Sequence, residues 1–376
     1  MGVDRVSPLP REHATGSTGG ADVVLAARCA VGTGLGHVVR CGAIAREVVA
    51  LGLRATVAVE DPEPLSDVQR RRIDEAGAQL VAWGTGGLRP LVDRLQPACV
   101  VLDDPTAPVS LDAELREERL LVVLDGSATR VRAADIVVDS TYSADPAAKW
   151  AGLLGDDALL LAGPRYAPID SRFAVLLADR RDPPPIPLRV AVALGGDDYT
   201  AAVRTVLRGL ASAPELVEQV DVVVGSMWAP TFDAGQVLPA GGGIGVRFHL
   251  DPPDPGAILA AADVAVGAMG MMAWERAFLG VPSLTLSVVD HQAAIAHALE
   301  STGAIEHLGT ADALDANRVS AAFAALAVDR ERRVRMADAA RRLFDCAVET
   351  GATAVARAIA DRIGGAARAR PAAVRR

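Results

Sequence analysis

The chain has 376 residues, which is enough for about two domains of ordinary size. Hydrophobic residues make up 51% and charged residues 23%, a balance typical of folded proteins that excludes a wholly disordered chain. The formal net charge is -9, which argues against a protein that binds nucleic acid by neutralising its phosphates. Lys149 is the only lysine, so Schiff-base or P-loop chemistry would have to use that residue.

The cysteines and the apolar runs bear on where the protein works. The 4 cysteines are scattered without a Cys-x-x-Cys pair, and we expect reduced cytosolic thiols rather than disulfides or a zinc site. No uncharged apolar run reaches the roughly 18 residues of a membrane span. The N-terminus lacks the basic and then apolar pattern of a signal peptide. We therefore expect a cytoplasmic protein without stable membrane insertion.

Short apolar runs alternate with helical patterns through the first half of the chain. This alternation predicts buried parallel strands joined through helices. The predicted strands are Ala21–Ala26, Ala55–Glu60, Gln79–Trp83, Ala98–Asp103, Arg119–Leu124 and Ile136–Val138. The predicted helices are Val38–Leu51 and Ser66–Ala76.

Four prolines within Asp182–Pro187 interrupt this pattern, because proline continues neither a helix nor a central strand. A second α/β series follows. Its predicted strands are Arg189–Leu194, Val220–Val224, Gly245–His249, Val264–Val266 and Ser283–Leu286, and its predicted helices are Asp198–Ala211, Pro255–Ala261, Met272–Leu279, Gln292–Thr302 and a group within Asn317–Arg362. The predicted division is a tail at 1–20, a domain at 21–181, a linker at 182–188, a domain at 189–363 and a tail at 364–376. The fold class is α/β, with two doubly wound Rossmann-like domains facing a central cleft.

The sharpest motif is the glycine-rich segment 32–37, which follows the first strand and opens the first helix. Glycines let the backbone approach a ligand closely, and a helix N-terminus attracts negative charge. His37 stands at the junction of loop and helix, where a neutral imidazole facing the cleft can act as a general base. The alternative is a histidine that only caps the helix. No clear acidic residue ends the next strand, so a dinucleotide-dependent oxidoreductase is the least favoured function.

Several motifs, taken in order, resemble one known family. Gly34-x-Gly36-His37-x-x-Arg40-Cys41 looks like its start, Val101–Asp104 like its strand-end aspartate, Leu194–Asp198 like its Gly-Gly-Ser/Thr-Asp loop, and Ala262–Ser283 is the closest stretch. The family contains the UDP-sugar hydrolase of pseudaminic acid biosynthesis and the related spore-coat polysaccharide glycosyltransferases. The resemblance covers about residues 21–310. It implies the two-domain GT-B architecture, which is similar to that of the peptidoglycan N-acetylglucosaminyltransferase.

The resemblance also implies roles for individual residues. His37 and Asp103 would be catalytic, with Asp103 orienting His37 or acting as the base itself. The second domain would hold the nucleotide, with the diphosphate at Gly195 and Gly196 and the ribose hydroxyls at Glu275. The full predicted binding set is Gly34, Gly36, Arg40, Asp104, Gly195, Gly196, Asp197, Gly270, Met271, Met272, Glu275, His291 and Gln292. An ordinary strand-to-helix turn at the two glycines and a solvated helix acid at Glu275 are the alternatives.

The chain departs from the family at positions that matter for chemistry. Pro105 stands where the hydrolase has a catalytic tyrosine, and Met271 and Met272 stand where hydroxyl side chains are common. We therefore predict inverting, metal-independent glycosyl transfer from a nucleotide-diphosphate sugar to a small acceptor, in sugar or secondary-metabolite biosynthesis. Hydrolysis of the same donor, with water as acceptor, and non-catalytic binding of a nucleotide sugar are the alternatives. No cofactor is expected, and no metal, because Asp103 and Asp104 lack an identifiable third ligand.

Overall fold

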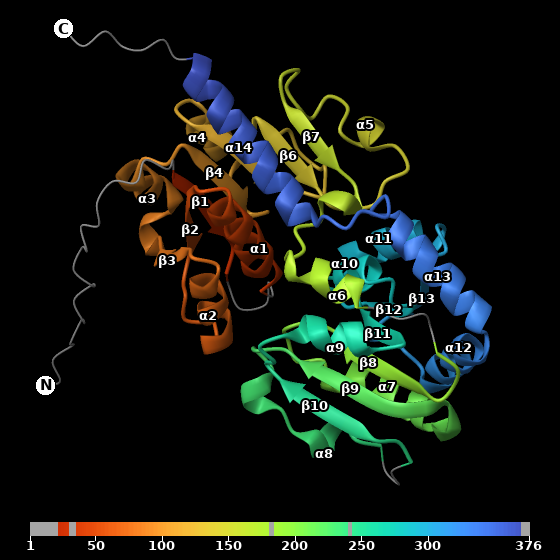
Figure 1. Ribbon diagram of the computed structural model, residues 1–376. Coiled ribbons are helices and arrows are strands. Elements are labelled where there is room, and N and C mark those ends of the chain that lie inside the picture. The colour runs from red at the N-terminus through yellow and green to blue at the C-terminus, as the bar shows by residue number, and fades with distance from the viewer. Residues whose placement is uncertain (1–21, 30–34, 180–183, 240–242, 370–376) are drawn as a thin grey trace, which may run out of the picture.

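The computed structural model describes residues 22–29, 35–179, 184–239 and 243–369. Two parallel sheets, each covered by helices, form the two halves of the molecule (Figure 1). The first sheet has the strand order β3-β2-β1-β4-β5-β6-β7 and the second has the order β10-β9-β8-β11-β12-β13. These two doubly wound sheets confirm the predicted fold class.

The first sheet is built from strands that are mostly buried on both faces. Its strands are β1 (Asp22–Ala27), β2 (Arg54–Val59), β3 (Gln79–Ala82), β4 (Cys99–Asp103), β5 (Leu120–Leu124), β6 (Ile136–Asp139) and β7 (Leu159–Ala162). The helices that come with it are α1 (Gly36–Ala50), α2 (Asp67–Glu75), α3 (Leu88–Leu95), α4 (Val109–Arg116), α5 (Pro146–Lys149) and α6 (Arg172–Ala178).

The second sheet repeats the same winding. Its strands are β8 (Leu188–Ala193), β9 (Val217–Val224), β10 (Val246–Leu250), β11 (Val264–Ala268), β12 (Ser283–Ser287) and β13 (Ile305–Thr310). The helices that follow are α7 (Thr200–Ala211), α8 (Ala234–Val237), α9 (Pro255–Ala261), α10 (Met271–Phe278), α11 (His291–Glu300), α12 (Ala316–Val328), α13 (Arg330–Arg342) and α14 (Gly351–Ala369).

Two strands escape the sequence pattern, and both lie at the edge of a sheet. β13 is the edge of the second sheet and carries Glu306 and His307 among its apolar residues. A strand that meets only one neighbour needs no continuous apolar run, so the pattern that marks buried strands is missing there. β7 is the edge of the first sheet and does have an apolar run, Leu-Leu-Leu-Ala, but a run of four residues cannot be told from part of a buried helix by periodicity.

Two helices pack on the opposite half from the one that the predicted boundaries imply. Helix α14 packs beside α1, and its Ala352, Val355 and Ile359 join the core of the first sheet. Helix α6 packs on α9 and α10 of the second half, with Phe173 in that core. The limits 21–181 and 189–363 stay a prediction, and these two helices pack across the division that they describe. Apolar spacing shows that a helix has a buried face but does not say which sheet covers it.

The winding of each sheet creates a point where the strand order reverses. In the first sheet this point lies between β1 and β4, and in the second it lies between β8 and β11. Loops at the carboxyl ends of strands diverge there and leave a crevice for ligands. Helices α1 and α10 begin at these two points. A Cβ added to Gly36 would lie 3.7 Å from Cγ of Met271, so the two helix starts meet across the halves.

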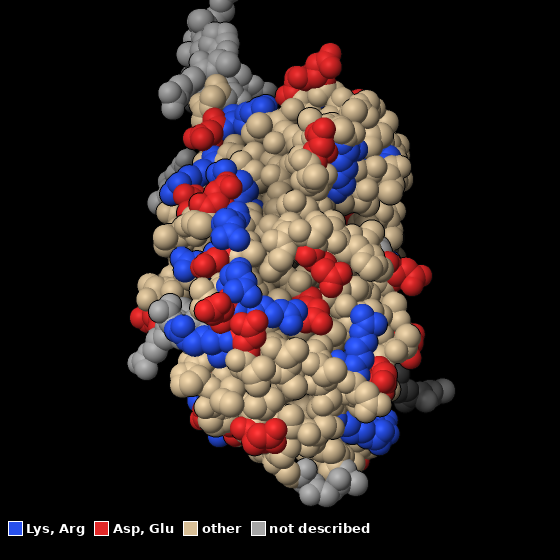
Figure 2. All heavy atoms as spheres, turned by 90° about the vertical axis from the view of Figure 1, so that its right-hand side faces the viewer, with Lys and Arg blue, Asp and Glu red and all other residues tan. Residues whose placement is uncertain are grey.

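The surface shown in Figure 2 mixes charges of both signs. Basic and acidic side chains interleave in one band, with uncharged surface beside it. Helix α13 lies on this side of the molecule, where Arg332 pairs with Glu306 at 2.8 Å and Arg335 with Glu331 at 3.6 Å. On this face the described residues thus lack the single-sign basic patch of a polyanion-binding surface. None of the described helices is long and apolar enough to cross a membrane.

Two glycines of α14 should respond oppositely to substitution by alanine. A Cβ at Gly351 would overlap the backbone of Tyr166 and Ala167, whereas a Cβ at Gly364 meets nothing within 4 Å. We expect Gly351→Ala to destabilise the protein by about 1–3 kcal/mol, because backbone cannot move aside as a side chain can. Gly364→Ala should stabilise it by roughly 0.5–1 kcal/mol through helix propensity. Chemical denaturation measures both, and an unaffected Gly351→Ala would contradict the packing of α14 on the first half.

Candidate functional site

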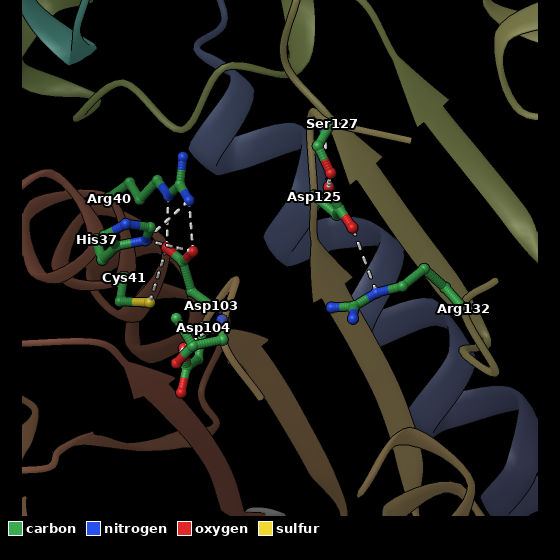
Figure 3. Close-up of polar contacts among 9 residues, drawn as sticks. His37, Arg40, Cys41, Asp103, Asp104, Asp125, Ser127 and Arg132 are labelled. Carbon is green, nitrogen blue, oxygen red and sulfur yellow. Dashed lines mark hydrogen bonds and ion pairs between the residues drawn. The ribbon is translucent and has the colours of Figure 1, made fainter. Parts of the chain in front are cut away.

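The crevice of the first half brings His37 and Asp103 together. His37 is the second residue of α1, and Asp103 is the last residue of β4. Their separation of 66 positions in sequence closes to 2.7 Å between His37 Nδ1 and Asp103 Oδ1. The side chain of His37 keeps 19% of its surface exposed, whereas that of Asp103 is fully buried (Figure 3). The imidazole is therefore held in place by Asp103 on its Nδ1 side and keeps part of its surface exposed.

Arg40, one turn further along α1, forms an ion pair with the same carboxylate. Its Nε donates to Asp103 Oδ2 and its Nη2 donates to Oδ1, which gives a two-pronged ion pair. Burial by itself would raise the pKa of Asp103, but the charge and hydrogen bonds of Arg40, followed by those of His37, hold that pKa below its usual value. Asp103 is thus an anion at neutral pH and accepts hydrogen bonds without donating any.

This charge state decides where the proton of His37 lies. A carboxylate oxygen at 2.7 Å from Nδ1 requires the proton to sit on Nδ1. Nη2 of Arg40 lies 3.0 Å from the same nitrogen, and two N–H groups cannot donate to each other, so this approach is not itself a hydrogen bond. The lone pair of the imidazole is therefore on Nε2. A histidine in this tautomer can accept a proton at Nε2 while Asp103 stabilises the resulting cation.

Cys41 completes the surroundings of the carboxylate. Its Sγ lies 3.8 Å from Asp103 Oδ2, and its side chain is buried. Burial and the neighbouring Asp103 raise the pKa of the thiol well above its usual value, against the opposing charge of Arg40. Since the thiolate is the reactive form, Cys41 is a poor nucleophile and serves as packing around the ion pair.

Asp104 was predicted to bind substrate and is engaged in a turn. Its Oδ1 accepts from the backbone N–H of Thr106 at 2.8 Å and from Thr106 Oγ1 at 2.7 Å. Arg28, which follows β1, donates to the same hydroxyl at 2.5 Å and lies 3.7 Å from Asp104. The next strand end carries Asp125, which caps its own turn through Ser127 (Figure 3). Polar turns after β4 and β5 therefore line the crevice next to His37.

The second half contributes a crowded glycine turn after β8. Gly195 has φ +129°, which side chains rarely tolerate, and a Cβ at Gly225 would overlap Gly196. Close backbone contact therefore requires glycine at position 225, and the positive φ favours glycine at position 195. The side chains of Tyr199 and Asp197 form a hydrogen bond. Burial raises the pKa of the Tyr199 hydroxyl to about 12, and the charge of Asp197 is the second cause of this rise. Residues 194–198 thus form a tight turn ahead of α7, and their phosphate-binding role stays a prediction.

The turn after β11 faces the first half. Gly270 precedes α10 and is exposed, and Met271 and Met272 are the first residues of that helix. Both methionines are partly buried and pack on the core of the second half. No side chain caps the start of α10, so its first backbone N–H groups remain available to an anion.

Glu275 lies one turn deeper on α10 and is buried, with 7% of its surface exposed. Its Oε2 has no hydrogen-bond partner. Burial raises the pKa of Glu275 to about 7, and Arg72, the next largest influence, opposes this rise. The carboxylate lines a pocket between the halves, together with residues of α1, α2, the segment 168–176 and the start of α9. The unpartnered Oε2 is itself closed to solvent, so a ligand hydroxyl that reaches it from the pocket would find a free acceptor.

The remaining predicted residues lie apart from the pocket or outside the description. Gln292 is buried, and its Oε1 accepts from the backbone N–H of Val288 at 2.9 Å, which stabilises the turn before α11. His291 begins α11, but its side chain is outside the described part of the structure. Gly34 also lies outside the described residues. The predicted sugar-binding role of His291 and Gln292 remains a prediction.

Sequence reasoning missed the charged residues that frame the pocket. Asp170 accepts from Arg172 at 2.9 and 3.0 Å and from Arg46 at 3.4 Å. Arg72 of α2 donates to the carbonyl oxygen of Pro253 at 2.7 Å, which joins the two halves. These residues come from three separate segments without a shared motif. Only the fold places them together.

Lys149 has a structural role. Its Nζ donates to Asp139 at 2.6 Å, to Thr141 at 2.7 Å and to the carbonyl oxygen of Gly126 at 2.7 Å. All three donor positions of the ammonium group are used. The single lysine of the chain therefore fastens the loops after β5 and β6 and is not available as a nucleophile.

Comparisons with known proteins identify the fold. The sequence matches no protein-family model and no curated protein. Among solved structures, MurG of Acinetobacter baumannii is 15% identical with a TM-score of 0.60, covering 91% of this chain and 99% of that chain. CalG4, the calicheamicin glycosyltransferase, is 16% identical with a TM-score of 0.59, covering 94% and 100%. The Streptomyces sp. SF2575 glycosyltransferase SsfS6, complexed with thymidine diphosphate, is 16% identical with a TM-score of 0.54, covering 91% and 99%.

These similarities extend over nearly the whole of both chains. Together with the two parallel sheets, they confirm the GT-B fold that the sequence resemblance implied. At such low identities they show the fold alone. The narrower resemblance to the pseudaminic-pathway and spore-coat proteins stays a prediction.

The ion pair of Asp103 should make stability depend on pH in a defined direction. Because the folded pKa is lowered, the contribution is complete above the unfolded pKa of about 3.9 and is lost as pH falls through the folded pKa. We expect Asp103→Asn to cost about 2–3 kcal/mol from pH 5 to pH 8, since it leaves Arg40 without its anion. The difference should shrink below about pH 4. Urea denaturation across this range measures it.

Asp104→Asn is the matched control, because an asparagine can keep the turn at that position. It should change stability little and show no such pH dependence. A wild type and Asp103→Asn pair that differ equally at pH 3.5 and pH 7 would show that Asp103 does not hold a lowered pKa.

Proposed function

We propose that the protein transfers a sugar from a nucleotide-diphosphate donor to the hydroxyl of a small acceptor, with inversion at the anomeric carbon and without a metal. The observation that carries this proposal is the contact between His37 and Asp103 in the crevice that faces the start of α10. The GT-B fold supports glycosyl transfer as the reaction class, because the structural neighbours with this fold include named glycosyltransferases. The uncapped start of α10 supports an anionic donor.

The transfer step follows from the tautomer of His37. Nε2 takes the proton of the acceptor hydroxyl as its oxygen forms a bond to the anomeric carbon. The bond from that carbon to the donor's diphosphate breaks, and the diphosphate leaves with the electron pair. Asp103 stabilises the imidazolium formed at His37, which later releases its proton to solvent. Attack from the side opposite the leaving group inverts the configuration.

Arg40 would act on this step through Asp103. Its two-pronged contact fixes the carboxylate in the plane that His37 Nδ1 needs and keeps it ionised. The earlier prediction that Arg40 binds substrate is therefore replaced by a proposal that it is a positioning residue. This assignment separates binding from turnover, because Arg40 need not touch the donor.

The donor's nucleoside would occupy the pocket between the halves. Glu275 lines this pocket and has the buried, unpartnered Oε2, and the start of α9 forms the adjoining wall. The diphosphate would lie against the starts of α7 and α10, where backbone N–H groups supply partial positive charge. Helix α2 reaches over the pocket from the first half, since Gln69 Nε2 donates to Ser226 at 2.9 Å. The closed halves would keep bulk water from the anomeric carbon.

Acceptor-dependent nucleotide release tests the proposal. A thermal-shift screen with UDP, TDP, GDP, ADP and CMP first identifies the base, because a bound nucleotide stabilises the folded state. The matching nucleotide sugar is then incubated with and without a panel of hydroxylated acceptors. We expect release only when an acceptor is present. Rapid release without acceptor would instead identify a hydrolase, and donor binding with no turnover would identify a binding protein.

Variants of the crevice should lower turnover without weakening donor binding. We expect His37→Ala to reduce kcat by about 10²–10⁴-fold at an unchanged donor KM, because the general base is lost. Arg40→Met should also lower kcat, and Arg40→Lys should restore part of it by keeping the charge near Asp103. Steady-state kinetics measures both constants. A raised donor KM with normal kcat in Arg40→Met would show that Arg40 binds substrate.

Arg54→Met is the matched control for Arg40. Arg54 pairs with Asp22 at 2.8 Å, but this pair lies at the start of β1, the opposite end of the sheet from the crevice. Its removal should leave both kcat and KM unchanged. A similar loss of kcat in this variant would indicate a general effect on the fold.

Binding of a ribonucleoside should strengthen as pH rises through about 7. The carboxylate form of Glu275 accepts hydrogen bonds at both oxygens, whereas the protonated form has less acceptor capacity. We expect uridine to bind several-fold more tightly at pH 8 than at pH 6. Calorimetry with uridine avoids the titration of phosphate groups. Glu275→Gln should bind weakly at both pH values, and a pH-independent wild type would exclude hydroxyl recognition by this carboxylate.

A further inference from the structure

Three arginines have side chains that are almost completely removed from solvent. Arg132 and Arg333 are each 1% exposed, and Arg276 is 0% exposed. Arg132 lies 3.4 Å from Asp112 and 3.5 Å from Asp125. These acids balance its charge. A buried guanidinium without such compensation would be costly.

Arg333 is compensated in a different way. Its guanidinium donates to the carbonyl oxygens of Leu326 at 3.1 Å, of Ala327 and of Pro184 at 2.6 Å. These contacts connect the end of α12 to the segment before β8. Carbonyl oxygens aimed at a cation supply partial negative charge, so Arg333 has a structural role.

Arg276 has much less compensation, because a single carbonyl oxygen is its one hydrogen-bond partner among the described residues. Its Nη2 donates to the carbonyl oxygen of Ala268 at 2.9 Å, whereas Nε and Nη1 have no hydrogen-bond partner. Among the described residues no carboxylate forms an ion pair with it. Burial lowers the pKa of Arg276 to about 10, against the opposing charge of Glu275, so the side chain still carries its proton at pH 7.

The location of this charge is specific. A Cβ at Gly267 would overlap Nη1 of Arg276 and would lie 2.7 Å from the carbonyl oxygen of Ala193. Gly267 and Ala193 are partners in the pairing of β11 with β8. The absence of a side chain at Gly267 therefore makes room for the guanidinium at the reversal point of the second sheet.

Both predicted phosphate turns begin beside this position. Gly195 and Gly196 follow Ala193 by two and three residues, and Gly270 follows Gly267 by three. The uncapped start of α10 opens from the same turn. The charge of Arg276 thus adds to the partial positive charge at the start of α10, and both raise the electrostatic potential of the same crevice.

We propose that Arg276 is the cation that holds the donor's diphosphate at the turn between β11 and α10, acting through the turn and not by direct contact. This inference rests on the proposed function and identifies the source of the positive charge in a chain without a free lysine. The diphosphate supplies the negative charge that no carboxylate of the described residues supplies to Arg276 through an ion pair. Bound diphosphate therefore gains more from Arg276 than the nucleoside does.

Inorganic pyrophosphate and a nucleoside, tested separately, isolate this effect. We compare the wild type, Arg276→Met and Arg276→Lys by calorimetry and thermal shift with pyrophosphate, with uridine diphosphate and with uridine. In Arg276→Met we expect pyrophosphate and uridine diphosphate to bind about 10–100-fold more weakly, as a lost charge at a few ångströms predicts. Uridine affinity should be unchanged. Arg276→Lys should keep part of the pyrophosphate affinity.

The ligand-free melting temperature separates this role from a structural one. Replacement of an uncompensated buried charge by an isosteric apolar side chain is often neutral or stabilising. We therefore expect the melting temperature of ligand-free Arg276→Met to equal or exceed that of the wild type. Arg333→Met, the matched control, should melt lower and bind pyrophosphate normally. Arg276→Met that melts lower and loses uridine and pyrophosphate affinity equally would assign Arg276 a structural role and overturn the proposal.

Two further outcomes are decisive. Arg276→Met with wild-type pyrophosphate affinity also overturns the proposal. A wild type that binds uridine diphosphate no better than uridine removes the diphosphate site, and the proposed function fails with it. Should Arg276→Met not fold, Arg276→Lys decides the matter. A desolvated lysine loses its proton at lower pH than arginine, so the pyrophosphate affinity of Arg276→Lys relative to that of the wild type should fall as pH rises above 7.

Discussion

The buried carboxylate of Asp103 is the group on which the arrangement of the crevice depends. Arg40 stabilises its ionised form, and the ionised carboxylate requires the proton of the His37 ring to lie on Nδ1. Neither partner is held independently: both stand on the first turns of α1, while the carboxylate ends β4. The register of α1 against the first sheet therefore sets the direction of the imidazole lone pair. A single strand end determines the protonation pattern of the site.

The two halves solve the problem of charge differently. In the first half a buried anion is fully compensated by its neighbours, which makes a rigid unit. In the second half Arg276 and Glu275 are adjacent in sequence, buried and incompletely partnered. Groups of this kind favour the state in which a ligand supplies the missing contacts. This contrast agrees with the proposal that the first half positions a proton acceptor and the second half receives a ligand with both anionic and hydroxyl groups.

Sequence patterns predicted those parts of the structure that depend on local order. Apolar runs predicted the central strands, and the glycine-rich segment predicted the start of α1. Because α1 begins and β4 ends at the same edge of the sheet, His37 and Asp103 lie in contact. The packing partners of α6 and α14 and the charged rim formed by Arg46, Arg72 and Asp170 depend on which distant segments meet. The contact between Arg40 and Asp103 was also not predicted, because a cation near glycine turns suggests a phosphate, while the nearest anion is a side chain of the protein.

The return of α14 to the first sheet has a consequence for the life of the chain. Residues Ala352, Val355, Ala356 and Ile359 fill a core whose other buried members lie within the first half of the sequence. On the ribosome, the first sheet is made early, yet the apolar surface that α14 covers stays open until residues 351–369 have also been made. The core of the first half is therefore completed only after the strands of the second sheet have been synthesised.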